Sequence, residues 1–428
     1  MIKAITGTKD ILPADIPQWR HIESVVLKVM NEFNYKEIRT PVFEQTILFT
    51  RGIGESTDIV SKEMYTFLDR SQTSITLKPE MTASVVRAFI EHSLEKKQSL
   101  NKFFYISPMF RQERPQAGRL RQFHQFGAEA LGSKSPILDA EMIIIPFRIL
   151  KLLGLKNLSV KINSLGVPQS RENYKKILKE YLKPHLNKLS EDSKKRVNTN
   201  ILRIFDSKDQ KDQEILNNAP LLIEYLDDES LEHFEKVKQA LLSAKIPFEV
   251  DARLVRGLDY YTHTTFEVIS GSVGSQSALC GGGRYDLLVK ELGGSETPGV
   301  GFAAGIERIL LACANEKSLR LNDESLDLFI VNIDKNLSDY AFNVSLFFRE
   351  NGLSVDLDYL NRSVKAQMRE ANRQNAKFVL ILGGEEFAKG EILLKDMNTS
   401  QQVTFLKDEL EKVVQKIKSQ LDANNLRS

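Results

Sequence analysis

One stretch of the sequence decides the fold of the first part of the chain: residues 102–129 read KFFYISPMFRQERPQAGRLRQFHQFGAE. Apolar residues flank an arginine-rich middle, which predicts two β-strands joined by a basic loop. The loop carries Arg111, Arg114, Arg119 and Arg121. These guanidinium groups repel one another unless an anion lies between them, and phosphate matches their planar fork. A solvated hairpin tip is the alternative interpretation.

Two features weaken that alternative. Glu113 lies between two of the arginines as an acceptor, and the spacing of Gln125 and Glu129 places both on one face of the second strand. The stretch therefore predicts a loop that binds a polyanion, beside a pocket with polar walls.

The composition indicates a soluble globular protein of two or three domains, with 428 residues, 42% of them apolar and 27% charged. The net charge of +2 excludes a uniformly basic surface, so a polyanion must meet local patches. Two cysteines and six scattered histidines suit a reducing cytoplasm and show no zinc-ligand spacing, so no metal ligand is predicted. Neither a signal peptide nor a membrane span is expected.

Periodicity of apolar residues predicts the remaining elements of the first half. These are a helix at 13–34, a strand at 37–40 ending at Pro41, a strand at 75–79, a helix opening at 79–82, a helix at 142–153 and a strand at 159–162. Residues 168–245 are highly charged with helical periodicity, and we interpret them as a helical insertion that forms no layer of the core.

Strands resume at 248–254, 264–269 and 276–280, followed by a helix at 305–314. Strands and helices then alternate, which predicts a small α/β domain with a mixed sheet. The predicted domains are therefore 1–167 with 246–320, the insertion 168–245, and 326–428.

Three further segments carry candidate chemistry. In LVRGLDYY (254–261), Arg256 leaves an apolar strand beside glycine and needs an anionic partner, whereas paired tyrosines are more often packing residues. In CGGGRYD (280–286), three glycines either admit a ligand close to the backbone or form a tight strand-to-helix turn. In GVGFAAGIER (299–308), Arg308 opposes the dipole of its helix, which favours a ligand anion over a plain surface role.

No phosphate loop of the Walker type and no dinucleotide-binding glycine motif is present in the sequence. One triphosphate would instead gather arginines from distant regions. These segments, with residues 52–66, resemble the signature segments of class II aminoacyl-tRNA synthetases. LVRGLDYY and TLKPEMT (76–82) are similar to the histidyl-tRNA synthetase family, and the likeness extends over essentially the whole chain.

The resemblance implies an α+β catalytic domain with an antiparallel sheet flanked by helices, a helical insertion and a C-terminal α/β anticodon-binding domain. It implies a homodimer joined around Pro41. It also implies ATP-dependent activation of L-histidine to histidyl-adenylate, with Mg²⁺, and transfer of the histidyl group to the 3′ end of tRNA(His).

The resemblance also assigns roles to residues. Arg111 and Arg256 would be catalytic, both gripping the α-phosphate, with Arg256 also touching the histidine carboxylate. The other ATP-binding residues would be Glu113 at the adenine amino group and Arg121 and Arg308 at the β- and γ-phosphates. Histidine would be held by Glu80, Thr82 and Gln125 at its ammonium group and by Glu129 and Tyr261 at its imidazole, with Tyr285 nearby. Gln116 and Arg119 would meet the tRNA acceptor end, and the helix carrying Arg362, Lys365, Arg369 and Arg373 either faces RNA or is solvated.

Two positions depart from the family pattern. Lys78 stands where arginine is common and Met81 where glycine is common, so we expect altered affinity and retained activity. Two other functions are alternatives. One is a non-catalytic paralogue that regulates histidine biosynthesis, which typically lacks the C-terminal domain and has eroded arginine and tyrosine segments. The other is an RNA-binding scaffold, which leaves Glu80, Gln125 and Glu129 without a role.

Overall fold

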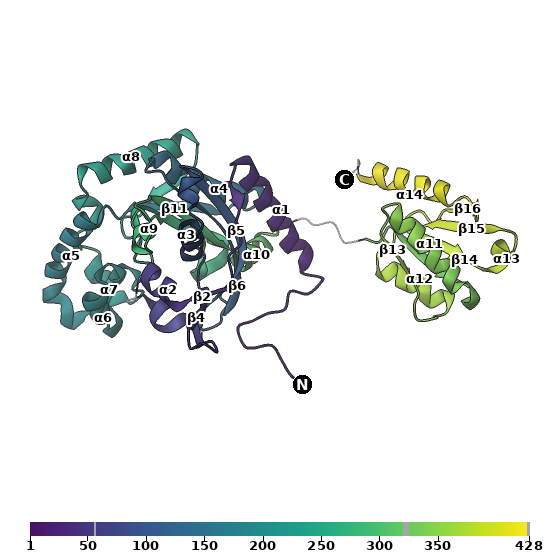
Figure 1. Ribbon diagram of the computed structural model, residues 1–428, viewed down its shortest axis with the longest axis horizontal. Coiled ribbons are helices and arrows are strands. Elements are labelled where there is room, and N and C mark those ends of the chain that lie inside the picture. Colours follow the sequence, from purple (N-terminus) through teal and green to yellow (C-terminus); the bar gives the residue numbers. More distant parts are fainter. Residues whose placement is uncertain (55–56, 320–324, 426–428) are drawn as a thin grey trace. The chain divides into compact units, whose positions relative to one another are not determined.

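The computed structural model describes residues 1–54, 57–319 and 325–425, and the chain divides into two compact units, Met1–Arg320 and Leu321–Ser428 (Figure 1). Each unit has its own sheet and its own buried core. We describe the two units separately.

An eight-stranded sheet forms the centre of the first unit. In spatial order its strands are β1 (Lys36–Glu37), β5 (Asn101–Phe110), β6 (Gln122–Leu131), β11 (Gly299–Gly305), β10 (Ala278–Arg284), β9 (Thr262–Ser270), β7 (Leu158–Ser164) and β8 (Phe248–Val250). Neighbouring strands are antiparallel except at the two edges, where β1 pairs with β5 and β8 with β7 in parallel. The predicted antiparallel sheet is thus confirmed.

The hairpin predicted from residues 102–129 is present. Strands β5 and β6 pair from Asn101 opposite Leu131 to Phe110 opposite Gln122, so the basic residues fall in the connecting loop. Within the loop, Gln116 and Arg119 form an isolated bridge. Gly118 makes that tight turn possible because its φ of +72° is one that side chains disfavour.

Helices α1 (Ile16–Glu32) and α4 (Pro136–Leu152) pack on the main core, together with α10 (Ile306–Glu316). A three-stranded sheet, β2 (Phe43–Gln45), β4 (Ser74–Leu77) and β3 (Tyr65–Leu68), lies beside α2 (Thr46–Ile53). The strand predicted at 75–79 ends at Leu77, and helix α3 (Thr82–Glu91) begins after it. The shorter elements are the π-helical turn η1 (Ile59–Glu63), η2 (Leu94–Lys96), η6 (Gly271–Gln276) and α9 (Leu288–Glu291).

The charged segment after β7 is helical throughout, as predicted. It contains α5 (Pro168–Leu182), η3 (Lys183–Lys188), α6 (Glu191–Thr199), η4 (Ile201–Asp206), α7 (Gln210–Leu216), η5 (Leu222–Tyr225) and α8 (Asp228–Ser243). However, α8 packs against α4, and its Phe234, Val237 and Leu241 are buried in the main core. The expectation that this segment contributes no core layer is therefore wrong for α8, because three apolar residues at helical spacing form a stripe within a charged sequence.

The structure of the glycine run, residues 281–283, decides against one of its two interpretations, the strand-to-helix turn. Strand β10 continues through Gly281, Gly282 and Gly283 to Arg284, between β9 and β11. The strand-to-helix turn is thus excluded. A Cβ atom at Gly282 would meet Phe302 of the neighbouring strand, so close contact between strands is one reason for glycine here.

The second unit has the predicted mixed sheet, in the order β13 (Val355–Leu357), β12 (Leu328–Asn332), β14 (Phe378–Leu382), β15 (Glu391–Asp396) and β16 (Gln402–Leu406). The first three strands are parallel and the last two antiparallel. Helices α11 (Ser338–Glu350) and α14 (Leu410–Asn425) cover one face, and α12 (Val364–Arg373) covers the other; α13 (Gly384–Ala388) is short. Among the helices described in either unit, none has the length and apolar character needed to span a bilayer.

Candidate active site

A cavity of about 830 Å³ lies over β6, β10 and β11 in the first unit. Its walls come from the β5–β6 loop, the start of α3, residues 256–261 and the start of α10. Most of the predicted site residues line it: Glu80, Thr82, Arg111, Glu113, Gln116, Arg119, Gln125, Arg256, Tyr261, Tyr285 and Arg308. Arg121 and Glu129 are not among its lining residues.

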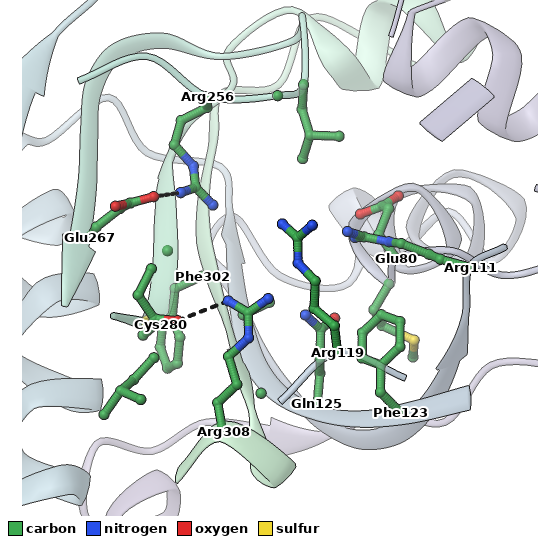
Figure 2. A pocket seen from close by; sticks show the side chains of 18 of the residues that line it. Glu80, Arg111, Arg119, Phe123, Gln125, Arg256, Glu267, Cys280, Phe302 and Arg308 are labelled. Atoms are coloured by element: carbon green, nitrogen blue, oxygen red, sulfur yellow. Dashed lines mark hydrogen bonds and ion pairs between the residues drawn. The ribbon is translucent and has the colours of Figure 1, made fainter. Parts of the chain in front are cut away.

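Four arginine side chains reach the cavity from three regions of the sequence, as Figure 2 shows. Arg256 faces Arg111 across the hollow, and Arg119 and Arg308 lie between them. Backbone carbonyls fix two of these cations. Arg111 Nε donates to Pro79 O at 2.9 Å, while Arg308 donates from Nε to Gly118 O and from Nη1 to Ala278 O, both at 3.0 Å. Burial and the charge of Arg119 lower the pKa of Arg308, which shows that these cations are crowded and would gain from an anion.

Arg256 lies against the backbone of β10. Its guanidinium forms an ion pair with Glu267 and occupies the space where a side chain of Gly281 would project. Its Nε atom is buried without a hydrogen-bond partner among the described residues. At Gly281 the space beside the backbone, which we predicted for a ligand, is therefore occupied by an arginine of the protein itself.

Arg119 and Arg121 are placed differently. Arg119 points into the cavity, where it lies 3.2 Å from Glu113, and its Nε has no hydrogen-bond partner in the described part of the chain. Arg121 instead packs under Gly7, and its Nε donates to Glu113 O at 3.4 Å. The structure thus brings Arg119, predicted for tRNA, next to Arg308, and leaves Arg121 outside the lining.

The part of the cavity beside the start of α3 is rich in polar groups. Glu80 accepts hydrogen bonds from the backbone N–H groups of Thr82 (2.7 Å) and Ala83 (2.9 Å) at the start of α3, and burial raises its pKa. Gln125 Oε1 is buried and has no hydrogen-bond partner among the described residues. An unpaired buried carbonyl is costly, so a ligand donor is its natural partner.

Glu129 lies directly behind this part of the cavity. Its carboxyl accepts hydrogen bonds from Thr82 Oγ1 (2.8 Å), Tyr105 OH (3.3 Å) and Tyr285 OH, and all three donors line the cavity. Burial, with a smaller contribution from the charge of Glu80, raises the pKa of Glu129 to about 8, although the hydrogen bonds from the three donors act to lower it. A pKa near 8 favours the protonated carboxyl at neutral pH.

Tyrosine rings form the wall beside it. The ring of Tyr260 lies 4.7 Å from that of Tyr261 and 5.7 Å from that of Tyr285, measured between centroids. No sequence pattern marks Tyr105 or Glu267 as a site residue. For Tyr105, the glycine at position 127 is an indirect signal, because Gly127 lies opposite Tyr105 in the β5–β6 hairpin and its missing side chain leaves room for the tyrosine ring. Asp206 and Lys208 also line the cavity, from the helical segment, where no motif marks them.

The two residues that depart from the family pattern, Lys78 and Met81, contact each other. Lys78 is fully buried, and its Nζ lies 3.5 Å from the sulfur of Met81, which lines the cavity. Burial lowers the pKa of Lys78 to about 8. The effect of this pair on substrate affinity stays a prediction.

The described residues contain no cluster of three or more histidine, cysteine or acidic side chains that would hold a metal ion. Two carboxylates, Glu267 and Glu307, nevertheless line the arginine-rich cavity. Mg²⁺ is commonly held by one or two carboxylates together with substrate phosphates and water, so these residues fit an ion that arrives with a nucleotide.

Comparison with known proteins agrees with this geometry. Residues 7–309 match the family model described as histidyl-tRNA synthetase, which is more than half of the chain. The chain belongs to the histidyl-tRNA synthetase family. Residues 327–417 match the model of an anticodon binding domain.

Relatives within the histidyl-tRNA synthetase family match over nearly full length. The histidine–tRNA ligase of Caldanaerobacter subterraneus subsp. tengcongensis is 49% identical over 414 residues, which covers 97% of this chain and 99% of that protein. The histidine–tRNA ligase of Halothermothrix orenii is 48% identical over 417 residues, or 97% and 99% of the two chains. The crystal structure of apo S. aureus histidyl-tRNA synthetase superposes with a TM-score of 0.82 at 40% identity, covering 98% of this chain and 100% of that one.

Proposed function

We propose that this protein is a histidine–tRNA ligase that activates L-histidine with ATP and transfers it to tRNA(His). The observation that carries the proposal is the convergence of Arg111, Arg119, Arg256 and Arg308 on one cavity that Glu80 and Gln125 also line. Family membership and the near-full-length relatives support it.

In the first step, a carboxylate oxygen of histidine attacks the α-phosphorus of ATP. The bond to pyrophosphate breaks, and histidyl-adenylate forms. Two anions must approach each other, so fixed guanidinium groups that stabilise the developing phosphoryl charge supply much of the rate enhancement. Arg111 and Arg256 would hold the α-phosphate from opposite sides, and Arg256 would also hold the histidine carboxylate.

The remaining ATP contacts follow from position. Arg308 and Arg119 lie together, where the β- and γ-phosphates of a bent ATP would pass, and Glu113 would accept from the adenine amino group. The resemblance gives Arg121 a phosphate role as well, but its side chain lies under Gly7 and outside the cavity lining, so we assign this phosphate contact to Arg119 in its place. Mg²⁺ bound to the phosphates would neutralise further charge, with Glu267 and Glu307 as its protein ligands.

Histidine would be recognised at both of its ends. Glu80, Thr82 and Gln125 would bind its ammonium group, and Tyr261, Glu129 and Tyr285 would surround its imidazole. Such a site rejects apolar amino acids, because its buried polar groups would be left unpaired. In the second step, a ribose hydroxyl at the 3′ end of the tRNA attacks the histidyl carbonyl and AMP leaves.

The tRNA would contact both units. Gln116 and Arg119 were predicted at the acceptor end, and Gln116 is exposed at the tip of the β5–β6 loop. In the second unit, Arg362 and Arg373 are each paired with Glu370, whereas Lys365 and Arg369 are exposed and form no ion pair with the residues that the structure describes. We propose that these two residues face the RNA, beside a cavity of about 270 Å³ lined by Asn332 and Arg362.

We further propose a cytoplasmic homodimer. One face of the three-stranded sheet carries Phe43, Phe67, Ile75 and Leu77, which lie directly opposite one another across the strands. Phe43 and Phe67 are about half exposed, at 50% and 48%. Burial of such a face against a second copy is favourable, so Phe43→Asp should produce monomers in analytical ultracentrifugation.

The regulatory-subunit alternative is not favoured. Arg111, Arg256, Tyr261 and Arg308 are all in place around the cavity, and the second unit matches an anticodon binding domain. The scaffold alternative leaves the buried polar end of the cavity unexplained.

Histidine-dependent exchange of pyrophosphate into ATP tests the activity. Wild-type protein should catalyse the exchange and charge tRNA(His), and Arg256→Ala should abolish both while retaining the thermal unfolding midpoint. Arg256→Lys keeps the charge without the bidentate fork and should recover only part of the rate. Exchange that does not depend on histidine, or that survives in Arg256→Ala, would refute the proposal.

A further inference from the structure

The loop of residues 254–261 carries groups for both substrates, since Arg256 and Tyr261 line the active-site cavity. A second cavity of about 440 Å³ lies next to this loop, and Arg256 and Leu258 line both cavities. Side chains therefore do not fill the space on that side of the loop, and packing supports it weakly there. Tyr260 and Tyr261 anchor the loop in a buried apolar cluster on its other side, so on the side of the second cavity hydrogen bonds from neighbouring elements supply the contacts.

The helical segment supplies two of these hydrogen bonds. Arg171 on α5 donates from Nη1 to the backbone carbonyl of Tyr261 at 2.6 Å. Asn200, between α6 and η4, donates from Nδ2 to Asp259 Oδ1, also at 2.6 Å. On another side, the backbone N–H of Asp259 donates to Ile53 O at 3.2 Å.

Arg171 is half-buried and lines only the second of the two cavities. It therefore lies outside the substrate cavity and acts on the loop from the other side. Burial lowers the pKa of its guanidinium, while the charge of Asp259 raises it. In such partly desolvated surroundings, a charged donor holds a carbonyl more firmly than it would in water.

We propose that Arg171 is a positioning residue for the reaction, which holds the end of the loop so that Tyr261 meets histidine, whereas Arg256 is held separately by its ion pair with Glu267 on β9. The helical segment would then set the affinity for the amino acid. This inference rests on the proposed function of the cavity.

The closing experiment compares Arg171→Met with Lys175→Met in full-length protein by pyrophosphate exchange. Lys175 lies one turn further along α5, lines the same second cavity and is paired with Glu172 at 2.7 Å, so its variant removes the same charge without touching the loop. We expect Arg171→Met to raise KM for histidine about tenfold or more and to lower kcat, because loss of a charge-assisted hydrogen bond misplaces the loop. KM for ATP should change less than about twofold, since Arg111 and Arg308 hold the nucleotide independently.

A second readout does not depend on activity. Hydrogen exchange of the peptide spanning 254–261 should be faster in Arg171→Met than in wild type and unchanged in Lys175→Met, and Arg171→Lys should give an intermediate rate and an intermediate KM for histidine. Three outcomes would overturn this inference and leave the proposed function standing. They are equal effects of Arg171→Met and Lys175→Met, equal changes in the KM values for histidine and ATP, and wild-type behaviour of Arg171→Met. Absence of histidine-dependent exchange in wild type would overturn the proposed function and this inference with it.

Discussion

The guanidinium of Arg256 occupies the space in which a side chain at Gly281 would project. The position of Arg256 therefore requires glycine at 281. A Cβ atom there would push the guanidinium aside without disturbing the backbone, because the guanidinium is the far end of a flexible side chain. Gly281→Ala should therefore lower the exchange rate about 100-fold or more by misplacing Arg256, with little loss of stability. Gly271→Ala is the matched control, since only Asn157 lies near its Cβ position, at 4.0 Å. Full activity in Gly281→Ala would show that Arg256 works from another position.

Histidine binding should release a proton near pH 7. The pKa of Glu129 is raised to about 8, mainly by burial, so the free enzyme holds this carboxyl protonated until the pH passes that value. An imidazole N–H that donates toward Glu129 favours the carboxylate and lowers its pKa, so about one proton should leave on binding. Calorimetry in buffers of different ionisation enthalpy measures this number, which should fall toward zero at pH 9 and in Glu129→Gln. An unchanged proton count in Glu129→Gln would exclude Glu129 as the source.

Arg119 and Arg121 should differ in their effect on ATP. Arg119 faces the cavity beside Arg308, whereas Arg121 lies under Gly7. Arg119→Ala should raise KM for ATP about tenfold, and Arg121→Ala should chiefly lower the unfolding temperature through lost packing. Steady-state exchange at varied ATP concentration separates the two. The opposite pattern would restore the assignment that the sequence suggested for Arg121.

Lys78 should make stability depend on pH above neutrality. Its side chain is fully buried, and burial lowers its pKa from 10.5 to about 8. Below pH 8 the amine is charged in both the native and the unfolded state, so the native state carries the whole burial cost. Between pH 8 and 10.5 the native amine is neutral while the unfolded one is still charged, so stability rises with pH, by about 3 kcal/mol in total.

Lys78→Met removes this cost and should be more stable than wild type at pH 7, by an amount that shrinks as the pH approaches 10. Unfolding temperatures of both proteins at a series of pH values measure the difference. A difference in unfolding temperature between the two proteins that stays constant from pH 7 to 10 would mean that Lys78 does not titrate as proposed.

Local patterns predicted much of the fold. The β5–β6 hairpin and the alternating strands and helices of the second unit follow from the spacing of apolar residues, and both are present. The start of α10, with Arg308 in its first turn, was also predicted correctly. These features depend on short stretches of sequence, in which periodicity and turn residues agree.

Features that depend on distant contacts were harder to predict. Arg119 and Arg121 are two residues apart and would share a face of a regular strand, but the bridge between Gln116 and Arg119 breaks the alternation, and Gly7 covers Arg121. The glycine run permitted a turn or a strand, and only its neighbours on β9 and β11 decide between them. The contact between Lys78 and Met81 likewise depends on the orientation of both side chains, which no local sequence pattern indicates.

The burial of Phe234, Val237 and Leu241 has a practical consequence for anyone who wishes to exchange pieces between such enzymes. Excising residues 168–243 as a cassette would strip α4 of its cover and leave an apolar surface exposed to solvent. A chimera that ends its graft before Asp228 and keeps the recipient's own α8 should stay folded. A graft can thus replace fewer residues than the charged composition of 168–245 suggests, because α8 belongs to the core of the catalytic unit.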